Sequence, residues 1–170
     1  MKELPTRKSV RLKGFDYSDM GAYFVTICVK DEHELLWDVP PVSADVDVGA
    51  AFCRPSLSDI GKIVENEIAI LSRTYKGVIV KQYVVMPNHV HMIVQIFDSG
   101  RQDAAPTVSR IIGQWKRTIS MKTGFSIWQK SFHDHIIRSK EEYRRICQYI
   151  EENPARWEED KYHTKNEPKS

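Results

Sequence analysis

The segment VVMPNHVHMIVQIF, Val84 to Phe97, decides the fold, because two runs of strand-forming residues meet across Pro87 and Asn88. Aliphatic and β-branched residues favour strands. The short separation predicts a β-hairpin formed by Val78 to Met86 and His89 to Phe97. Met-Pro-Asn is not one of the favoured primed turns, so the strands are the stronger signal for this hairpin.

The second strand of this hairpin opens with two histidines one residue apart. Because side chains alternate along a strand, His89 and His91 share one face, and an aliphatic row forms the other: Val90, Met92, Val94 and Ile96. The aliphatic row must be a core face. The histidine Cα atoms lie about 7 Å apart by strand rise, so both imidazoles can converge on one divalent ion. Such a site would keep open positions for a substrate oxygen. The alternative is a pair of polar residues on a half-exposed face.

The rest of the chain supplies a strand and a helix before this hairpin, and a helix, a short strand and a final helix after it. The expected elements are a strand over Ala22 to Lys30, a helix from about Leu57 with Ser58 as N-cap, a helix over Thr107 to Lys122, a short strand within Ser131 to Arg138, and a helix over Ser139 to Asn153. A capping box of Ser139 and Glu142 starts the last helix, and Pro154 ends it. The order β, α, β-β, α, β, α predicts an α+β fold with a ferredoxin-like antiparallel sheet and helices packed on it. A doubly wound sheet would need more strands.

The bulk composition fits a single globular domain. The chain has 170 residues, of which 41% are hydrophobic and 28% are charged. We expect one domain over residues 1–170, with a basic arm over 1–14, a variable loop over 38–56 and a polar tail over 158–170. No apolar run approaches the roughly 20 residues that span a bilayer, so we expect a cytoplasmic protein without a membrane partner. The three cysteines form no CxxC pair and are expected to be free thiols.

Basic residues gather in two stretches although the net charge is only +2. One is the N-terminal arm, with Arg11 and Lys13, and the other is the second expected helix, with Lys116 and Arg117. This distribution is compatible with phosphate binding. Ordinary solvated helix faces would look the same.

The final expected helix places a phenol beside a carboxamide. Tyr149 lies next to the apolar stripe, and Asn153 is its i+4 neighbour on the same side. Tyr143 lies within the stripe and is expected to pack. A phenol can act as a covalent nucleophile toward a phosphodiester, but its ordinary pKa of about 10 makes it a poor one without a nearby cation. The alternative is that Tyr149 is an ordinary half-buried aromatic residue without a catalytic role.

Three segments together resemble a known family. They are YVVMPNHVHMIV (Tyr83 to Val94), FHDHIIRSKEEYRRICQYIEENPARW (Phe132 to Trp157) and RKSVRLKGFDYSDMGAYFVTICV (Arg7 to Val29). They are similar to the single-tyrosine HUH transposases, and more narrowly to the REP-associated tyrosine transposase-like proteins. The resemblance covers nearly the whole chain apart from residues 38–54 and the end.

The resemblance implies a nucleoid-associated DNA strand transferase that cuts and rejoins single-stranded DNA near a hairpin and works as a homodimer. His89 and His91 would bind Mg²⁺ or Mn²⁺, with Asn153 as the third ligand where relatives carry a glutamine. Tyr149 would attack the scissile phosphate and form a 5′-phosphotyrosine link. Contacts to DNA would come from these residues: Arg11, Lys13, Lys116, Arg117, His135 and Arg138.

Two other readings stay open. The chain could be a ferredoxin-like nucleic-acid-binding module without catalysis. It could also be a metal-dependent phosphodiester hydrolase that uses His133 and His135 together with His89 and His91, while Tyr149 only packs.

Overall fold

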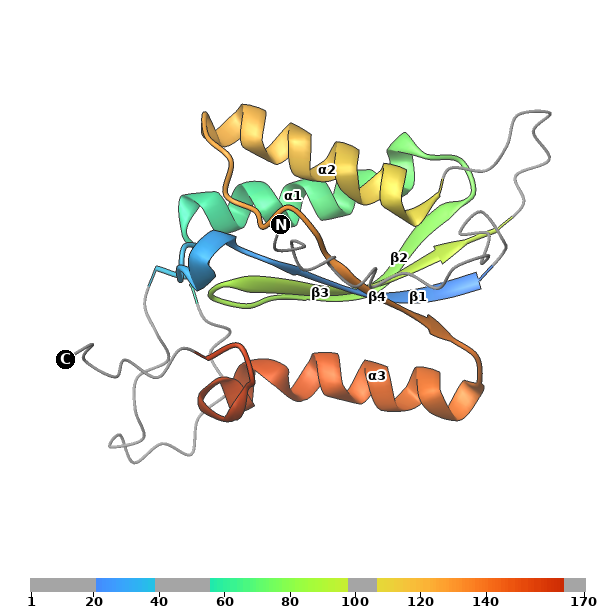
Figure 1. Cartoon of the computed structure of the whole chain (residues 1–170). Helices are drawn as coiled ribbons and strands as arrows, with labels where there is room; N and C mark the ends of the chain where they lie inside the picture. Colours follow the sequence, from blue (N-terminus) through green and yellow to red (C-terminus); the bar gives the residue numbers. More distant parts are fainter. Residues whose placement is uncertain (1–20, 39–55, 98–106, 164–170) are drawn as a thin grey trace, which may run out of the picture.

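A computed structural model describes residues 21–38, 56–97 and 107–163 of the chain. The N-terminal arm, with Arg11 and Lys13, and most of the variable loop lie outside the described residues. The described elements alternate as the sequence predicts (Figure 1): β1 Gly21–Cys28, the 3-10 turn η1 Lys30–Glu32, α1 Asp59–Thr74, β2 Val78–Val85, β3 His89–Ile96, α2 Val108–Thr123, β4 His133–Ile137, α3 Lys140–Glu152 and η2 Asn153–Glu159.

The four strands form one antiparallel-paired sheet in the order β2-β3-β1-β4. β3 pairs antiparallel with both β1 and β2, and β4 pairs antiparallel with β1. The α+β class and the antiparallel sheet with packed helices are therefore confirmed. β1 and β3 are the central strands, and Thr26 of β1 lies directly opposite His91 of β3.

Helices cover both faces of this sheet (Figure 1). α1 and α2 lie on one face, and α3 with η2 lies on the other. The expected caps are present, because the Ser58 hydroxyl accepts from the Gly61 N–H and the Ser139 hydroxyl accepts from the Glu142 N–H. The expected stripe of α2 is buried under the aliphatic face of β3: Val108, Ile111, Ile112, Trp115 and Ile119.

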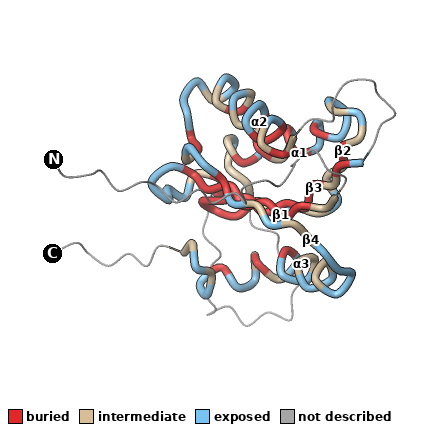
Figure 2. The backbone as a smooth tube through the Cα atoms, turned by 45° about the vertical axis from the view of Figure 1, so that its right-hand side comes forward, coloured by how far each residue is buried: buried red, intermediate tan, exposed pale blue. Residues whose placement is uncertain are grey.

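The histidine face of β3 is also buried, so the alternative of a half-exposed polar face is wrong. His89 is 0% exposed and His91 is 1% exposed. The buried tube of β1 and β3 runs between the two helical layers (Figure 2). The physical reason is that α3 and η2 cover this face and set Trp157 and Asn153 among its buried residues. β3 is thus enclosed on both sides, and its histidines stand in a second, polar interior.

Two smaller expectations can be judged in the described part of the chain. The β2–β3 turn is closed by a hydrogen bond from the Met86 N–H to the His89 carbonyl at 2.8 Å, and neither Pro87 nor Asn88 has the positive φ of a primed turn. Cys28 is buried and Cys147 is half-buried, both as free thiols. None of the described helices is long and apolar enough to cross a membrane.

Candidate active site

The two histidines of β3 converge as the strand alternation predicts. Their Nε2 atoms lie 3.0 Å apart. The other nitrogen of each ring, Nδ1, makes a hydrogen bond to a neighbouring side chain. His89 Nδ1 lies 2.8 Å from Asn88 Oδ1, and His91 Nδ1 lies 2.8 Å from Thr26 Oγ1. Second contacts of this kind fix the orientation and tautomer of metal-binding imidazoles. Both Nε2 atoms therefore face the same point.

Asn88 fixes the tautomer of His89. Its amide nitrogen donates to the carbonyls of Tyr162 and Glu32, at 2.7 and 3.3 Å. Its Oδ1 can only accept, so the hydrogen of the His89 ring must be on Nδ1. His89 Nε2, which lies 3.0 Å from His91 Nε2, then carries the lone pair that a cation would need. The turn residue of the MPNHVH segment thus acts on the site, a role that the sequence did not reveal.

Tyr149 reaches the histidine pair from α3. Its hydroxyl lies 3.2 Å from His91 Nε2 and donates to Asp160 Oδ2 at 3.3 Å. The ring stands edge-on to Phe24, and Phe24 stacks on His91 with ring centroids 5.1 Å apart. Tyr149 is 38% exposed, so the phenol faces the buried histidines at one end and solvent at the other. The candidate nucleophile and the candidate metal ligands therefore meet within one chain.

Two side chains with candidate oxygen ligands, Asp160 and Asn153, contact each other beside the histidine pair. The Asn153 amide nitrogen donates to Asp160 Oδ2 at 3.0 Å, while Asn153 Oδ1 is buried without a hydrogen-bond partner. Within the described residues, the group of side chains that could hold a metal ion is His89, His91 and Asp160, whose ligand atoms all lie within 4.8 Å of one another. An unpaired buried oxygen, a carboxylate and two imidazoles fit a divalent cation.

Asp160 is a candidate ligand that the sequence patterns do not predict. It lies in the expected polar tail, and no spacing links it to a strand or helix. Its position is fixed locally, because Asp160 Oδ1 accepts from the Tyr162 N–H at 2.7 Å. The tail residue Tyr162 in turn packs over the His89 ring, with centroids 4.6 Å apart. The acidic run from Glu158 to Asp160 was the one available signal, and runs of this kind are common on solvated surfaces.

Burial sets the protonation of the site. It lowers the pKa of His89 to about 4, and it lowers the pKa of His91 well below the usual range, with the His89 charge adding to the effect. Burial, with the neighbouring Asp160 carboxylate, raises the pKa of Tyr149 to about 12. The imidazoles are thus neutral at pH 7, the form that a metal ligand needs, and the phenol is un-ionised unless a cation offsets the negative charge.

These pKa values predict that the metal-free protein loses stability in mild acid. Unfolded histidines bind protons below about pH 6.5, whereas the buried pair stays neutral down to about pH 4. Between these limits the unfolded chain binds more protons, so the free energy of unfolding falls as the pH falls. Each excess proton contributes about 1.4 kcal/mol per pH unit. Urea unfolding in chelator at pH 7, 6 and 5 measures the slope.

The matched variants are His91→Gln and His133→Gln. The His133 side chain is exposed, so its replacement should leave the pH slope of the wild type unchanged. The slope should become shallower in His91→Gln. Equal slopes in all three proteins would contradict the assigned protonation.

A cavity of about 360 Å³ opens beside Tyr149, between α3 and the β1–β4 side of the sheet. His135 lines it, and its Nε2 is bonded to Glu142 Oε1 at 2.7 Å. The second Glu142 oxygen accepts from the Arg138 N–H at 2.8 Å. Two of the expected DNA-binding residues, His135 and Arg138, therefore border the Tyr149 side of the sheet.

The other expected basic residues of the described chain lie across the sheet. Lys116 and Arg117 belong to α2, on the face opposite α3 (Figure 1). The Lys116 ammonium donates to the carbonyls of Gln129, Lys130 and Ser131, and burial lowers its pKa to about 8. Lys116 therefore ties α2 to the segment before β4. Arg117 is exposed and stays a prediction for backbone contacts.

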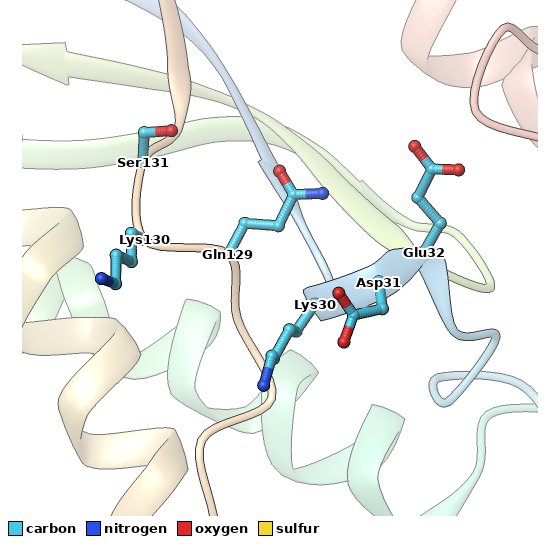
Figure 3. Close-up of a pocket in the computed structure, with 6 residues that line it drawn as sticks. All are labelled: Lys30, Asp31, Glu32, Gln129, Lys130 and Ser131. Atoms are coloured by element: carbon cyan, nitrogen blue, oxygen red, sulfur yellow. The ribbon is translucent and has the colours of Figure 1, made fainter. Parts of the chain in front are cut away.

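A larger cavity of about 440 Å³ is lined by this segment and by Lys30, Asp31 and Glu32, with no histidine in its lining. Figure 3 shows its walls, η1 and residues 129–131, with the Lys130 and Glu32 side chains directed away from each other. Asp31 and Glu32 adopt positive φ angles of 55° and 58°. Neither His91 nor Tyr149 lines this cavity, whereas both line the smaller one.

The four-histidine hydrolase site is not formed. His133 and His135 are not members of the histidine–aspartate group found among the described residues, and His135 is committed to Glu142. In sheet register they lie opposite Thr26 and Phe24 on the edge strand β4, and not opposite the β3 pair. The four histidines therefore do not form the metal-ligand set that the hydrolase alternative requires.

Comparison with known proteins supports the fold assignment. No model of a known protein family matches the chain. It is 26% identical over 175 residues to an uncharacterized protein of Haemophilus influenzae, with 91% of each chain covered. Among solved structures, it is similar to a REP-associated tyrosine transposase bound to a REP hairpin, with a TM-score of 0.58, 22% identity, and coverage of 92% of this chain and 74% of that one. The resemblance indicated by the three sequence segments is thus confirmed at the level of the fold.

Proposed function

We propose that this chain is a single-tyrosine HUH strand transferase that cleaves and rejoins single-stranded DNA through a 5′-phosphotyrosine link. The observation that carries the proposal is the 3.2 Å approach of the Tyr149 hydroxyl to His91 Nε2 within one chain. The solved neighbour supports the substrate class, because that transposase is bound to a DNA hairpin. A module that only binds DNA would have no need for a half-exposed phenol on a buried histidine pair.

The chain's own groups account for the covalent step. The Tyr149 oxygen would bond to phosphorus while the bond from phosphorus to the 3′ oxygen breaks. The phenolic proton would pass to Asp160, whose Oδ2 already accepts the Tyr149 hydrogen bond, and from there to the departing 3′ oxygen. The reverse attack by a DNA 3′-hydroxyl would rejoin the strands, because a phenolate is a moderate leaving group.

The ligand set fits Mg²⁺ or Mn²⁺. His89 and His91 would supply nitrogen ligands, and two oxygens compete for the third position: Asn153 Oδ1, as the sequence predicts, and the Asp160 carboxylate. When bound, the ion would neutralise charge on the scissile phosphate and on the phenolate. The oxygen ligands are of the kind that Mg²⁺ and Mn²⁺ prefer, and the two imidazoles add nitrogen ligands that other first-row divalent ions also bind.

Partners follow from the same proposal. Single-stranded or hairpin DNA would be the substrate. The sheet edge at β4, with His135 and Arg138, would contact part of this DNA. A homodimer stays a prediction, and the grouping of Tyr149 with His91 in one chain means that a partner is not needed to bring these two groups together. A cytoplasmic, nucleoid-associated location is likewise proposed.

The direct test is covalent capture of DNA. The full chain is incubated with labelled single-stranded hairpin DNA carrying randomised flanks, with and without Mn²⁺, and run on a denaturing gel. A Mn²⁺-dependent band in which the label moves with the protein supports the proposal. Cleavage without an adduct would indicate hydrolysis. Binding without cleavage would indicate the non-catalytic module.

Asn88 offers a sharper probe of the metal site. Asn88→Ala removes the acceptor for the His89 Nδ1 hydrogen, and loss of a second contact of this kind typically weakens metal binding by about 10- to 100-fold. It also leaves the buried Tyr162 carbonyl without its donor, which should destabilise the fold by about 1–3 kcal/mol. Titration calorimetry with Mn²⁺ and urea unfolding measure the two effects.

Asn88→Asp separates these effects. The carboxylate keeps an acceptor for His89 but loses both N–H donors, so Mn²⁺ affinity should survive while stability falls. Unchanged Mn²⁺ affinity in Asn88→Ala would show that Asn88 does not set the His89 tautomer.

A further inference from the structure

The cavity beside Tyr149 has the walls of a base-binding subsite. Its lining includes Phe24 from β1, and Glu142, Arg145 and Tyr149 from α3. Arg145 follows Glu142 by three positions and Tyr149 follows Arg145 by four, so these side chains lie in one row along the helix. The volume of about 360 Å³ lies within the usual range for small-molecule sites, roughly 300–1,000 Å³.

Phe24 supplies an aromatic surface at this place. Phe24 is only half-buried, although it belongs to the central strand β1, which lies between the His91 strand β3 and the edge strand β4. Its ring already stacks on His91 and meets Tyr149 edge-on. A nucleobase that enters the cavity would extend this aromatic group. Stacking on aromatic side chains is the main way in which proteins hold unpaired bases.

The charges around the cavity match one nucleotide. Arg145 and Lys161 are exposed cations that line it and could meet a phosphate. Glu142 is the acidic member, and its oxygens accept from His135 and from the Arg138 N–H. Each carboxylate oxygen can accept a second hydrogen bond. An ionised carboxylate can only accept, so it favours a base that offers an amino group.

We propose that this cavity accepts the nucleobase next to the scissile phosphate, stacked on Phe24 and read by Glu142, which selects a base with an exocyclic amino group over thymine. The inference rests on the proposed strand transfer, because Tyr149 both lines the cavity and reaches His91. The nucleotide whose phosphate meets the Tyr149 hydroxyl then has this cavity directly beside it.

A binding experiment tests the subsite without catalysis. Full-length Tyr149→Phe in chelator is titrated into single-stranded oligonucleotides that carry 2-aminopurine at one position in turn. The proposal expects fluorescence quenching at one position next to the hairpin, and Phe24→Ala should weaken that binding by roughly 5- to 100-fold. Phe125→Ala is the matched control, because Phe125 is 53% exposed and follows α2, outside the cavity lining. Equal binding by the two variants would overturn the stacking role.

A sequencing experiment tests the base preference. DNA from the covalent adduct of the wild type, formed on hairpins with randomised flanks, is sequenced at the linked phosphate. Thymine should be depleted at one flanking position, and Glu142→Gln should restore it, because an amide can also donate. Adducts without any thymine bias would overturn the reading by Glu142 while leaving strand transfer intact. Absence of any adduct, with Phe24-dependent quenching retained, would instead overturn strand transfer and leave a base-binding cavity.

Discussion

Tyr149→Phe should reduce the covalent protein–DNA adduct to background while leaving the fold intact. The phenol oxygen is the atom that would join the phosphate, and phenylalanine keeps the ring that meets Phe24 edge-on. The substitution removes only the hydroxyl, with its contacts to His91 and Asp160. Because covalent catalysis is lost entirely, strand rejoining should fall by at least about 10³-fold. Gel analysis of labelled hairpin DNA with Mn²⁺ measures both quantities.

Tyr143→Phe is the matched control. Tyr143 lies on the same helix and is also a half-buried phenol, but no contact joins it to the histidine pair. Its adduct should equal that of the wild type. An adduct that survives in Tyr149→Phe and disappears in Tyr143→Phe would transfer the nucleophile to Tyr143. Survival in both variants would remove tyrosine from the mechanism.

His91→Gln should give the second large effect, a loss of Mn²⁺-dependent cleavage by roughly 10²- to 10⁴-fold. Metal stabilisation of phosphoryl charge is worth several kcal/mol, and each 1.4 kcal/mol is a factor of ten in rate. His91 also carries the contact to Tyr149. The same variant should abolish the increase in melting temperature that Mn²⁺ gives to the wild type, an effect that does not depend on DNA.

His133→Gln again serves as the control, since it removes an exposed histidine from the same sheet face and should change neither quantity. Asn153→Ala and Asp160→Asn then identify the third ligand. The true ligand should lose Mn²⁺ binding nearly as fully as His91→Gln. A Mn²⁺-induced shift that persists in His91→Gln would show that the ion binds elsewhere.

Much of the fold could be predicted because local and long-range signals agree. The aliphatic row of β3, the stripe of α2 and the Ser58 cap each specify an element and its buried side. Strand ends moved by one or two residues, as in β1, which stops at Cys28. The burial of the histidine face was not predicted. The alternation of side chains along a strand shows which residues share a face, but it does not show which helix later in the chain covers that face.

The site could be predicted only where residues share an element. His89 with His91, and Tyr149 with Asn153, were paired by strand and helix periodicity. Asp160, Asn88 and Thr26 reach the same site through tertiary folding, and no periodicity connects them to β3. Lys116, which was expected to contact DNA, donates to carbonyls of its own chain in the structure, and its contact with DNA stays a prediction.

The two halves of the site are anchored very differently. β3 is a central strand buried on both faces, whereas Ile150 is the one residue of α3 that is fully buried. Amide hydrogens around His89 and His91 should therefore exchange with solvent only on global unfolding, and those of α3 through local opening. Tyr149 can then move away from the histidine pair while β3 stays folded. Backbone motion, rather than ligand rearrangement, would set how often Tyr149 is in position.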